Sequence, residues 1–368
     1  MQEKDYMELA VSLAKKGTGR VNPNPLVGAV IVKDDQIIGT GFHEQYGGLH
    51  AERNALKNCK TSPEGASIYV TLTPCCHYGK TPPCTEAIIE SGISRVVIGS
   101  RDPNPLVGAK SIAILEQAGI EVVTDFMKET CDDLNPVFFH YITEKTPYVV
   151  MKYASTLDGK IATRTGASKW ITGKASRARV QESRNQYMGI MAGSGTVLKD
   201  DPLLTCRIPG GRNPIRIICD TKLVTPLDSQ LVKTAGKIPL ILATGVQDEE
   251  RLTPYKEAGC QILAAHLTPE GHIDLRDLMK QLGAMGIDSI LLEGGGTLNW
   301  SALKSGIVHK IEAYIAPKIF GGETAPSPIR GEGIAFPSEA VELEHIHITQ
   351  IDQDLLIEGE VKTCLQES

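Results

Sequence analysis

The sequence predicts an α/β protein built from two domains in series. The chain has 368 residues, which is more than one ordinary core and suits two domains of common size. Apolar strands alternate with amphipathic helices through about residue 141, a pattern typical of helices packed on a sheet. The polar segment 143–147 ends in a proline, and a new strand follows it. We therefore expect one domain at residues 1–145 and another at residues 146–368.

The first domain is expected to begin with a helix over about residues 4–16, which ends at Gly17. Two apolar runs at 27–33 and 36–42 follow, and only two aspartates separate them, which predicts a β-hairpin. Helices are then expected at 50–58, 84–91, 108–118 and 127–141, and strands at 67–72, 95–100 and 120–123.

The second domain is expected to begin with a strand directly after residue 147. Further strands are predicted at about 188–193, 214–219, 239–243, 289–293, 310–316, 344–350 and 354–361. Helices are predicted near 174–186, 248–258, 274–283 and 297–305.

The composition argues against several classes of protein. The formal charge is −6 and no run is rich in Lys or Arg, so we expect no nucleic-acid partner. The first helix lacks the apolar core of a signal peptide, and no stretch approaches the ~18 apolar residues of a membrane span. We therefore expect a cytoplasmic protein with no membrane partner and with reduced cysteines. Most of the nine cysteines are interpreted as apolar fillers, whereas Cys75, Cys76 and Cys84 cluster among prolines and a histidine.

Two segments of the first domain carry the residue types of a catalytic zinc site. His50 and Glu52 begin one predicted helix, while Cys75 and Cys84 each follow a proline where the chain passes into a helix. One imidazole and two thiolates would leave the fourth zinc position to water, and zinc lowers the pKa of such a water toward ~7. Glu52 is then the candidate for proton transfer. This division of labour belongs to the zinc deaminases, whose signature is H-x-E followed by P-C-x-x-C.

Two points leave alternatives open at this stage. Eight residues separate Cys75 from Cys84, whereas the signature has two, and a histidine and a glutamate on an exposed helix face would give the same H-x-E triplet. Cys76 and His77 are rival ligands. Cys75 is preferred because it directly follows Pro74 at the end of a strand, as the signature requires, and Cys76 is interpreted as a small buried filler.

Several long segments, in order, resemble the bifunctional deaminase–reductases of riboflavin biosynthesis. They are HAERNAL, YVTLTPCCHYGKTPPCTEAII and SRVVIGSRDPNPLVGAKSI in the first domain, and KYASTLDGKIA, SKWITG, SGTVLKDDPLLTCR and LLEGGGTLNW in the second. The resemblance covers essentially the whole chain, and the longer cysteine spacing is that family's form of the motif. It implies a cytidine-deaminase-like three-layer α/β/α domain followed by a dihydrofolate-reductase-like α/β domain.

The resemblance implies two consecutive reactions. The first domain would remove the 2-amino group of 2,5-diamino-6-ribosylamino-4(3H)-pyrimidinone 5′-phosphate with the aid of zinc. The second would reduce the ribosyl chain to ribityl with NADPH. In the deaminase pocket the resemblance implies Asn24, His43, His77, Lys80, Asp102 and Asn104. One departure is Thr73, which stands where the family usually has Glu, a carboxylate that is not a ligand in the signature.

The glycine run Gly294–Gly296 lies between an apolar strand and a helix, where backbone N–H groups can approach a phosphate. It is not the G-x-G-x-x-G fingerprint, so a doubly wound dinucleotide domain is the weaker interpretation. Lys152, Asp200 and Glu293 are the candidates for proton transfer to the substrate. By resemblance, the NADPH-binding residues are Ala154, Trp170, Thr196, Asp200, Thr221, Gly295, Gly296 and Thr297, and the substrate-binding residues are Ser168, Arg184, Leu204, Arg207 and Glu293.

Two rival functions are kept. One is a nucleoside or tRNA-type zinc deaminase whose C-terminal domain binds without catalysing. The other is a protein with a structural zinc and a C-terminal binding module, although three ligands beside a glutamate disfavour a closed site. In the main interpretation the substrate is expected to be a small pyrimidine ribotide, and the protein is expected to be a homo-oligomer.

Overall fold

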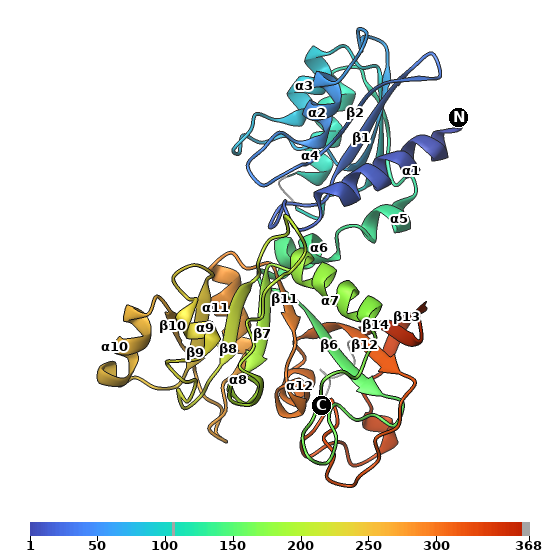
Figure 1. Ribbon diagram of the computed structural model, residues 1–368. Helices are drawn as coiled ribbons and strands as arrows, with labels where there is room; N and C mark the ends of the chain where they lie inside the picture. The colour runs from blue at the N-terminus through green and yellow to red at the C-terminus, as the bar shows by residue number, and fades with distance from the viewer. Residues whose placement is uncertain (105–106, 363–368) are drawn as a thin grey trace. The chain divides into compact units, whose positions relative to one another are not determined.

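The computed structural model describes residues 1–104 and 107–362, and the chain divides into two compact units (Figure 1). Unit 1 runs from Met1 to Lys145, and unit 2 begins at Thr146. Each unit has its own sheet and its own apolar core. Among the described residues, no helix is both long enough and apolar enough to cross a membrane.

Unit 1 is a five-stranded sheet with helices on both faces. Its strand order is β2-β1-β3-β4-β5, in which β1 is antiparallel to β2 and β3, and β3, β4 and β5 are parallel. The strands are β1 Gly28–Lys33, β2 Gln36–Phe42, β3 Ser67–Leu72, β4 Arg95–Ser100 and β5 Glu121–Val123. The helices are α1 Glu3–Ala14, α2 Ala51–Lys57, α3 Cys84–Glu90, α4 Gly108–Gln117, α5 Lys128–Asp132 and α6 Pro136–Glu144, with a 3₁₀ turn at Lys15–Gly17.

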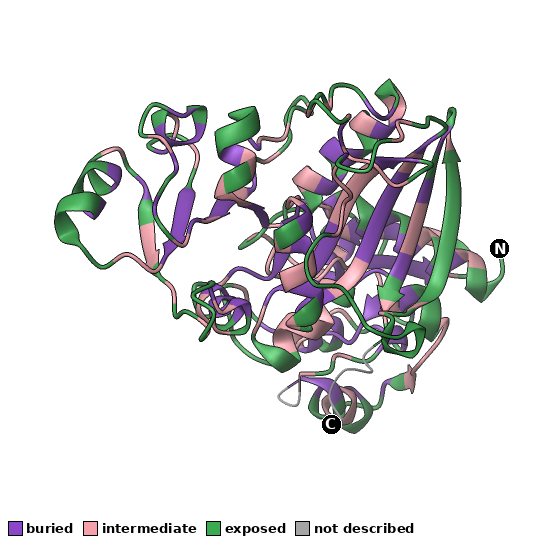
Figure 2. Cartoon of the chain, turned by 90° about the horizontal axis from the view of Figure 1, so that it is seen from below, coloured by how far each residue is buried: buried purple, intermediate pink, exposed green. Residues whose placement is uncertain are grey.

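The alternation of side chains along β1 divides the core of unit 1 into two layers. Ala29 and Ile31 pack with α2, α3 and α4, whereas Val30 and Val32 pack with α1 and α5. Helix α2 lies very close to β2 at Gly41, which has no side chain. A Cβ at this position would stand 2.3 Å from the backbone nitrogen of Ala55, so a larger residue could not fit there. The strands in the interior carry the buried colour in Figure 2. This is the three-layer α/β/α arrangement.

One predicted helix of unit 1 is wrong. The segment 127–141 was expected to be continuous, but α5 ends at Asp132 and α6 begins at Pro136. Pro136 has no N–H to continue a helix. The side chain of Asn135 meanwhile accepts the N–H of Leu26 at 2.7 Å and donates to its carbonyl at 2.9 Å. Asn135, which lies between the two helices, thus holds the segment that leads into β1.

Unit 2 is a nine-stranded sheet in the order β10-β9-β8-β7-β11-β6-β12-β14-β13. The strands from β10 to β12 are parallel, and β14 and β13 add an antiparallel ribbon. They are β6 Tyr148–Thr156, β7 Gly189–Gly193, β8 Ile215–Cys219, β9 Leu240–Thr244, β10 Gln261–Ala264, β11 Ser289–Leu292, β12 Val308–Ala316, β13 Leu343–Ile351 and β14 Asp354–Val361. The helices are α7 Lys174–Gln186, α8 Ser194–Asp200, α9 Gln230–Lys233, α10 Glu249–Glu257, α11 Leu275–Ala284 and α12 Gly296–Lys304, with a 3₁₀ turn at Pro337–Glu339.

The parallel part of this sheet determines where unit 2 can bind a ligand. Strands β8, β7, β11 and β6 are neighbours, and all of them run in the same direction. Their carboxyl ends therefore meet at one edge, which is where open α/β sheets bind ligands. The short elements α8, α9 and β10 were not predicted from the sequence.

Candidate functional site

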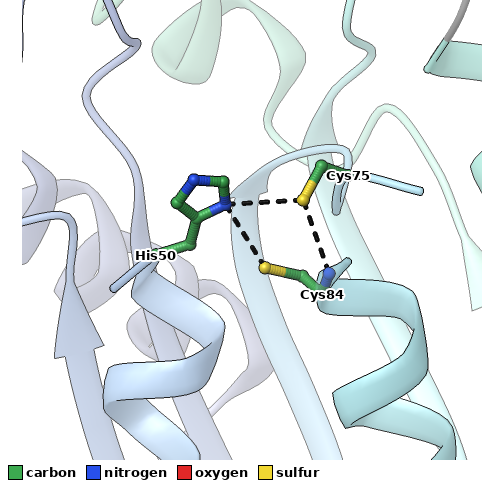
Figure 3. A group of neighbouring side chains, drawn as sticks. All are labelled: His50, Cys75 and Cys84. Carbon is green, nitrogen blue, oxygen red and sulfur yellow. Dashed lines mark hydrogen bonds between the residues drawn. The ribbon is translucent and has the colours of Figure 1, made fainter. Parts of the chain in front are cut away.

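His50, Cys75 and Cys84 converge in unit 1 (Figure 3). His50 caps the N-terminus of α2 and Cys84 is the first residue of α3, while Cys75 lies in the loop after β3. The His50 Nδ1 atom is 3.4 Å from the sulfur of Cys75 and 3.4 Å from that of Cys84. Among the described residues that surround this group, neither Cys76 nor His77 belongs to it. Cys76 is half-buried, so its interpretation as a buried filler is wrong.

The donor set suits zinc. Three ligand atoms within 4.8 Å of one another can share one tetrahedral ion, for which Zn–N is ~2.0 Å and Zn–S ~2.3 Å. Hydrogen bonding from Cys84 and from His50 lowers the pKa of the Cys75 thiol, and the contact with Cys75 raises the pKa of Cys84. The backbone N–H of Cys84 also donates to the Cys75 sulfur at 3.4 Å. Three protein ligands leave one position open, which is the pattern of catalytic zinc.

Glu52 lies beside this group in the first turn of α2. Its side chain is buried, and burial raises its pKa from the ordinary value. Glu52 and two of the ligands, His50 and Cys75, line a cavity of about 300 Å³ in unit 1. A carboxyl with a raised pKa at the wall of a cavity is typical of a general acid and base.

The same cavity brings together every residue that the sequence analysis placed in the deaminase pocket. These are Asn24, His43, His77, Lys80, Asp102 and Asn104. Burial raises the pKa of Asp102 to about 6. The ammonium of Lys80 lies 3.9 Å from the ring centre of Tyr46, which also lines the cavity.

His43 fixes the orientation of the Asn24 amide. The His43 Nδ1 atom is 3.0 Å from the carbonyl of Leu49, which can only accept, so this nitrogen carries the proton. Burial lowers the pKa of His43, so the neutral ring then has a lone pair on Nε2. The Asn24 Nδ2 atom is 3.1 Å from Nε2 and donates to it. The Asn24 carbonyl oxygen therefore remains as an acceptor on a residue that lines the cavity.

Unit 2 contains a larger cavity of about 580 Å³ at the carboxyl edge of its parallel strands. Its wall contains residues that the sequence analysis assigned to the reductase: Lys152, Ala154, Ser168, Thr196, Asp200, Thr221, Glu293, Gly295, Gly296 and Thr297. Gly295 caps the N-terminus of α12, and a Cβ there would meet nothing closer than the Thr196 hydroxyl at 3.9 Å. A Cβ at Gly195 would meet no atom within 4 Å. The glycines therefore leave room for a ligand at the backbone of α8 and α12, which suits the phosphates of a nucleotide.

Glu293 is the centre of a buried ion network in this unit. Its carboxylate accepts from Arg184 Nε at 2.7 Å and Nη2 at 3.0 Å, and Lys152 Nζ lies 3.5 Å away. Burial alone would raise the pKa of Glu293, but Arg184 and Lys152 outweigh it and lower the pKa to about 2. Glu293 is therefore ionised at neutral pH, whereas a general acid would have to hold a proton.

Four of the residues expected in the reductase site lie outside the wall of the cavity: Trp170, Arg184, Leu204 and Arg207. Arg184 reaches the site through Glu293 and also donates to the carbonyl of Thr205 at 3.1 Å. Trp170 is 61% exposed, and the guanidinium carbon of Arg177 lies 4.5 Å from its ring centre. Leu204 is buried with a positive φ, and Arg207 is exposed.

Comparison with known proteins agrees with these two sites. Residues 1–100 match the cytidine and deoxycytidylate deaminase zinc-binding region, and residues 147–357 match the RibD C-terminal domain. The riboflavin biosynthesis protein RibD of Actinobacillus pleuropneumoniae is 52% identical over 97% of this chain and 95% of its own length. That of Bacillus amyloliquefaciens is 43% identical over 96% of this chain and 95% of its own length. This chain belongs to the RibD family.

Solved structures give the same result for the fold. A diaminohydroxyphosphoribosylaminopyrimidine deaminase/5-amino-6-(5-phosphoribosylamino)uracil reductase from Thermotoga maritima aligns over 98% of both chains, with a TM-score of 0.87 and 38% identity. RibD from Acinetobacter baumannii aligns over 98% of both chains, with a TM-score of 0.88 and 34% identity. The expected fold class, a cytidine-deaminase-like domain followed by a reductase domain of the RibD type, is confirmed.

The RibD cavities also contain residues that the sequence analysis did not name. Tyr46 lines the cavity of unit 1, and Lys199 and Arg330 line that of unit 2. Tyr46 follows His43 in a glycine-rich loop, and Lys199 precedes Asp200, so closeness to a predicted site residue was the available signal for both. Arg330 had none, because it reaches the cavity from a loop that is distant in sequence.

Proposed function

We propose that this chain catalyses two consecutive steps of riboflavin biosynthesis, one in each unit. Unit 1 deaminates 2,5-diamino-6-ribosylamino-4(3H)-pyrimidinone 5′-phosphate, and unit 2 reduces the ribosyl chain of the product to ribityl with NADPH. The observation that carries the proposal is the group His50, Cys75 and Cys84 beside a buried Glu52, in a chain that matches RibD over its whole length. The glycine-lined cavity of unit 2 supports the second activity.

In unit 1, His50, Cys75 and Cys84 would hold the zinc. Zinc with three protein ligands supplies a water of lowered pKa for attack on the amino-bearing carbon. The buried Glu52 would take one proton from the reacting water and deliver it to the ring nitrogen, and would then carry a second proton from the added hydroxyl to the leaving amine. Burial raises its pKa from the ordinary value, which suits a group that both accepts and donates a proton.

The remaining polar groups of unit 1 would bind and orient the ribotide. Asn24, with its carbonyl oxygen free, can accept from a ring N–H, and His43 fixes that orientation. Asp102 and Asn104, with His77, offer further contacts to the pyrimidinone edge. Lys80 at the cavity wall provides a cation for a phosphate or ribose oxygen.

In unit 2, the cofactor would lie along Ala154, Thr196, Asp200, Thr221 and the loop Gly295–Thr297, all of which line the cavity. The family resemblance adds Trp170, which lies outside the cavity wall. The substrate would meet Ser168, Arg184, Leu204, Arg207 and Glu293. NADPH supplies the hydride, and the protein must orient the two reactants. Because Arg184 already donates to Glu293 and to Thr205, its remaining N–H groups are those available to a phosphate.

Proton transfer during the reduction is assigned to Lys152 or Asp200 rather than to Glu293. Lys152 and Asp200 both line the cavity. Glu293, with a pKa of about 2, would hold the lysine ammonium in place. Lys152 is thus the stronger candidate for the acid.

We also propose that the protein is a cytoplasmic homo-oligomer. β13 is an edge strand, and its Ile346 and Ile348 are 54% and 65% exposed. A long edge strand with exposed apolar side chains is a template for pairing with another chain, and a second copy offers the same edge. If so, Ile348→Lys should reduce the mass measured by analytical ultracentrifugation, and an unchanged mass would count against this interface.

The proposed cytoplasmic location agrees with the state of the cysteines. The described cysteines are free, which suits a reducing compartment.

The test of the proposed function is Glu52→Gln, assayed for zinc content, deamination and reduction. The variant should keep its zinc and its NADPH-dependent reduction of the deaminated substrate, while deamination falls by about a hundredfold or more. Glu86→Gln on α3 serves as the control, because Glu86 is in the first turn of its helix but outside the cavity. A Glu52→Gln variant that still deaminates at the parental rate would reject the role of Glu52.

A further inference from the structure

Thr73 has a specific structural role at the end of β3. It lies directly after this strand, is buried and lines the cavity of unit 1. Its backbone N–H donates to the Ser100 carbonyl at 3.0 Å, and its hydroxyl donates to the same carbonyl at 3.4 Å. The Thr73 hydroxyl in turn accepts the backbone N–H of Asp102 at 3.1 Å. One side chain therefore joins the end of β3 to the segment that follows β4.

The segment joined in this way carries two of the expected substrate contacts. The carboxylate of Asp102 accepts the backbone N–H of Asn104 at 2.8 Å, so the two residues form one local turn. Asp102 and Asn104 both line the cavity. The backbone on the N-terminal side of this turn is held at Asp102, whose N–H has the Thr73 hydroxyl as its acceptor.

We propose that Thr73 is a positioning residue for deamination, whose hydroxyl holds the Asp102 turn so that Asp102 and Asn104 face the pyrimidinone. This inference rests on the proposed function of unit 1. The chain has no carboxylate at this position, and a neutral hydroxyl suits it because it donates to one neighbour while accepting from another. A carboxylate could only accept, so it could not donate to Ser100 while accepting from Asp102.

Removing this hydroxyl should affect substrate binding more than chemistry. Valine has nearly the volume of threonine, so Thr73→Val fills the same space but leaves the N–H of Asp102 without an acceptor. The turn formed by Asp102 and Asn104 is then free to move, and part of the binding energy of the substrate is used to return it to the position that it has in the parent. Because Asp102 and Asn104 would bind the substrate equally in the ground state and in the transition state, the loss should appear in KM rather than in kcat.

The same strand offers a matched control. Thr71 lies two residues earlier on β3, is also fully buried, and its hydroxyl accepts the N–H of Gly28 at 3.2 Å. Thr71 is absent from the cavity wall. Thr71→Val therefore removes a buried hydroxyl that also accepts a backbone N–H, but away from the site.

The experiment measures deamination kinetics and thermal unfolding of the full-length, zinc-loaded protein for Thr73→Val, Thr73→Ser and Thr71→Val. Thr73→Val should raise KM about tenfold with kcat within about threefold of the parent, Thr73→Ser should restore KM, and Thr71→Val should leave KM within about twofold. In an Asp102→Ala background, Thr73→Val should raise KM by a smaller factor than in the parent, because one of the two side chains that the turn positions is gone.

An unchanged KM in Thr73→Val would overturn the inference, as would an equal rise in Thr71→Val. Independent, additive effects of Thr73→Val and Asp102→Ala would also overturn it. Failure of the proposed function is a distinct result, since the parent protein itself would then not release ammonia from the substrate.

Discussion

Replacing Arg184 by methionine should destabilise unit 2, and by an amount that depends on pH. Arg184 and Glu293 have side chains that are each 13% exposed, so the variant leaves a buried carboxylate with Lys152 as its remaining cation. The pKa of Glu293 is about 2 against an ordinary value of 4.5, a difference that corresponds to ~3 kcal/mol. Removal of one partner from a buried ion pair typically costs ~3–5 kcal/mol. We therefore expect Arg184→Met to lose about 3 kcal/mol at pH 7.

The sign of the pH dependence follows from the direction of the pKa change. A carboxyl whose folded pKa is lowered stabilises the fold above its unfolded pKa, and this contribution is lost as pH falls from 4.5 toward 2. In Arg184→Met, only Lys152 still opposes the effect of burial, so the pKa of Glu293 moves up from its value in the parent and the carboxyl protonates at a higher pH. The difference in unfolding free energy between parent and variant should therefore shrink as the pH is lowered below about 4.5.

The assay is urea unfolding followed by tryptophan fluorescence. Both tryptophans of the chain, Trp170 and Trp300, belong to unit 2, so the signal reports this unit. Arg179→Met is the control, because Arg179 is on the same helix but its side chain is 47% exposed in its pair with Glu182. An exposed pair should contribute less than ~1 kcal/mol. A loss in Arg184→Met as small as in the control, or one that does not change with pH, would refute the reasoning.

Three further predictions concern the two cavities. Chelation of the metal should stop deamination but leave the oxidation of NADPH with the deaminated substrate intact. Each unit has its own apolar core, so loss of the metal from unit 1 should not unfold unit 2. Loss of both activities would contradict this prediction. ¹⁵N NMR should find His43 protonated on Nδ1, and a proton on Nε2 instead would reverse the orientation of Asn24. Gly295→Ala should raise the KM for NADPH about tenfold, because the added methyl group would enter the cavity. The variant should keep the parent's stability, because alanine readily adopts the φ of −78° found at this position. An unchanged KM would place the cofactor elsewhere.

The residues of the metal group could be predicted from the sequence because the information is local. His50 and Cys84 stand at the starts of helices and Cys75 stands in the loop after β3, and their residue types suit one metal. The preference for Cys75 over its neighbour Cys76 followed from its place after Pro74, and the structure agrees in bringing Cys75 to His50. The long helices and most strands also followed from local periodicity.

Interactions between distant segments left no such local signal. Arg184 and Glu293 are 109 positions apart, and nothing in the sequence around either residue indicates their ion pair. Asn135 likewise holds Leu26, also 109 positions away, and thereby interrupts the helix expected at 127–141. The hydrogen bond from Asp102 to Thr73 depends on β3 and β4 being neighbours, and the order of strands in a sheet is not encoded in local periodicity.

The measurement that tests the two-step account most directly is mass spectrometry of the products formed from the diaminopyrimidinone ribotide, with and without NADPH. The account predicts replacement of the 2-amino group by oxygen without NADPH, and the gain of two hydrogens once NADPH is added. Deamination with NADPH left unused would contradict the role of unit 2, and reduction without deamination would contradict that of unit 1.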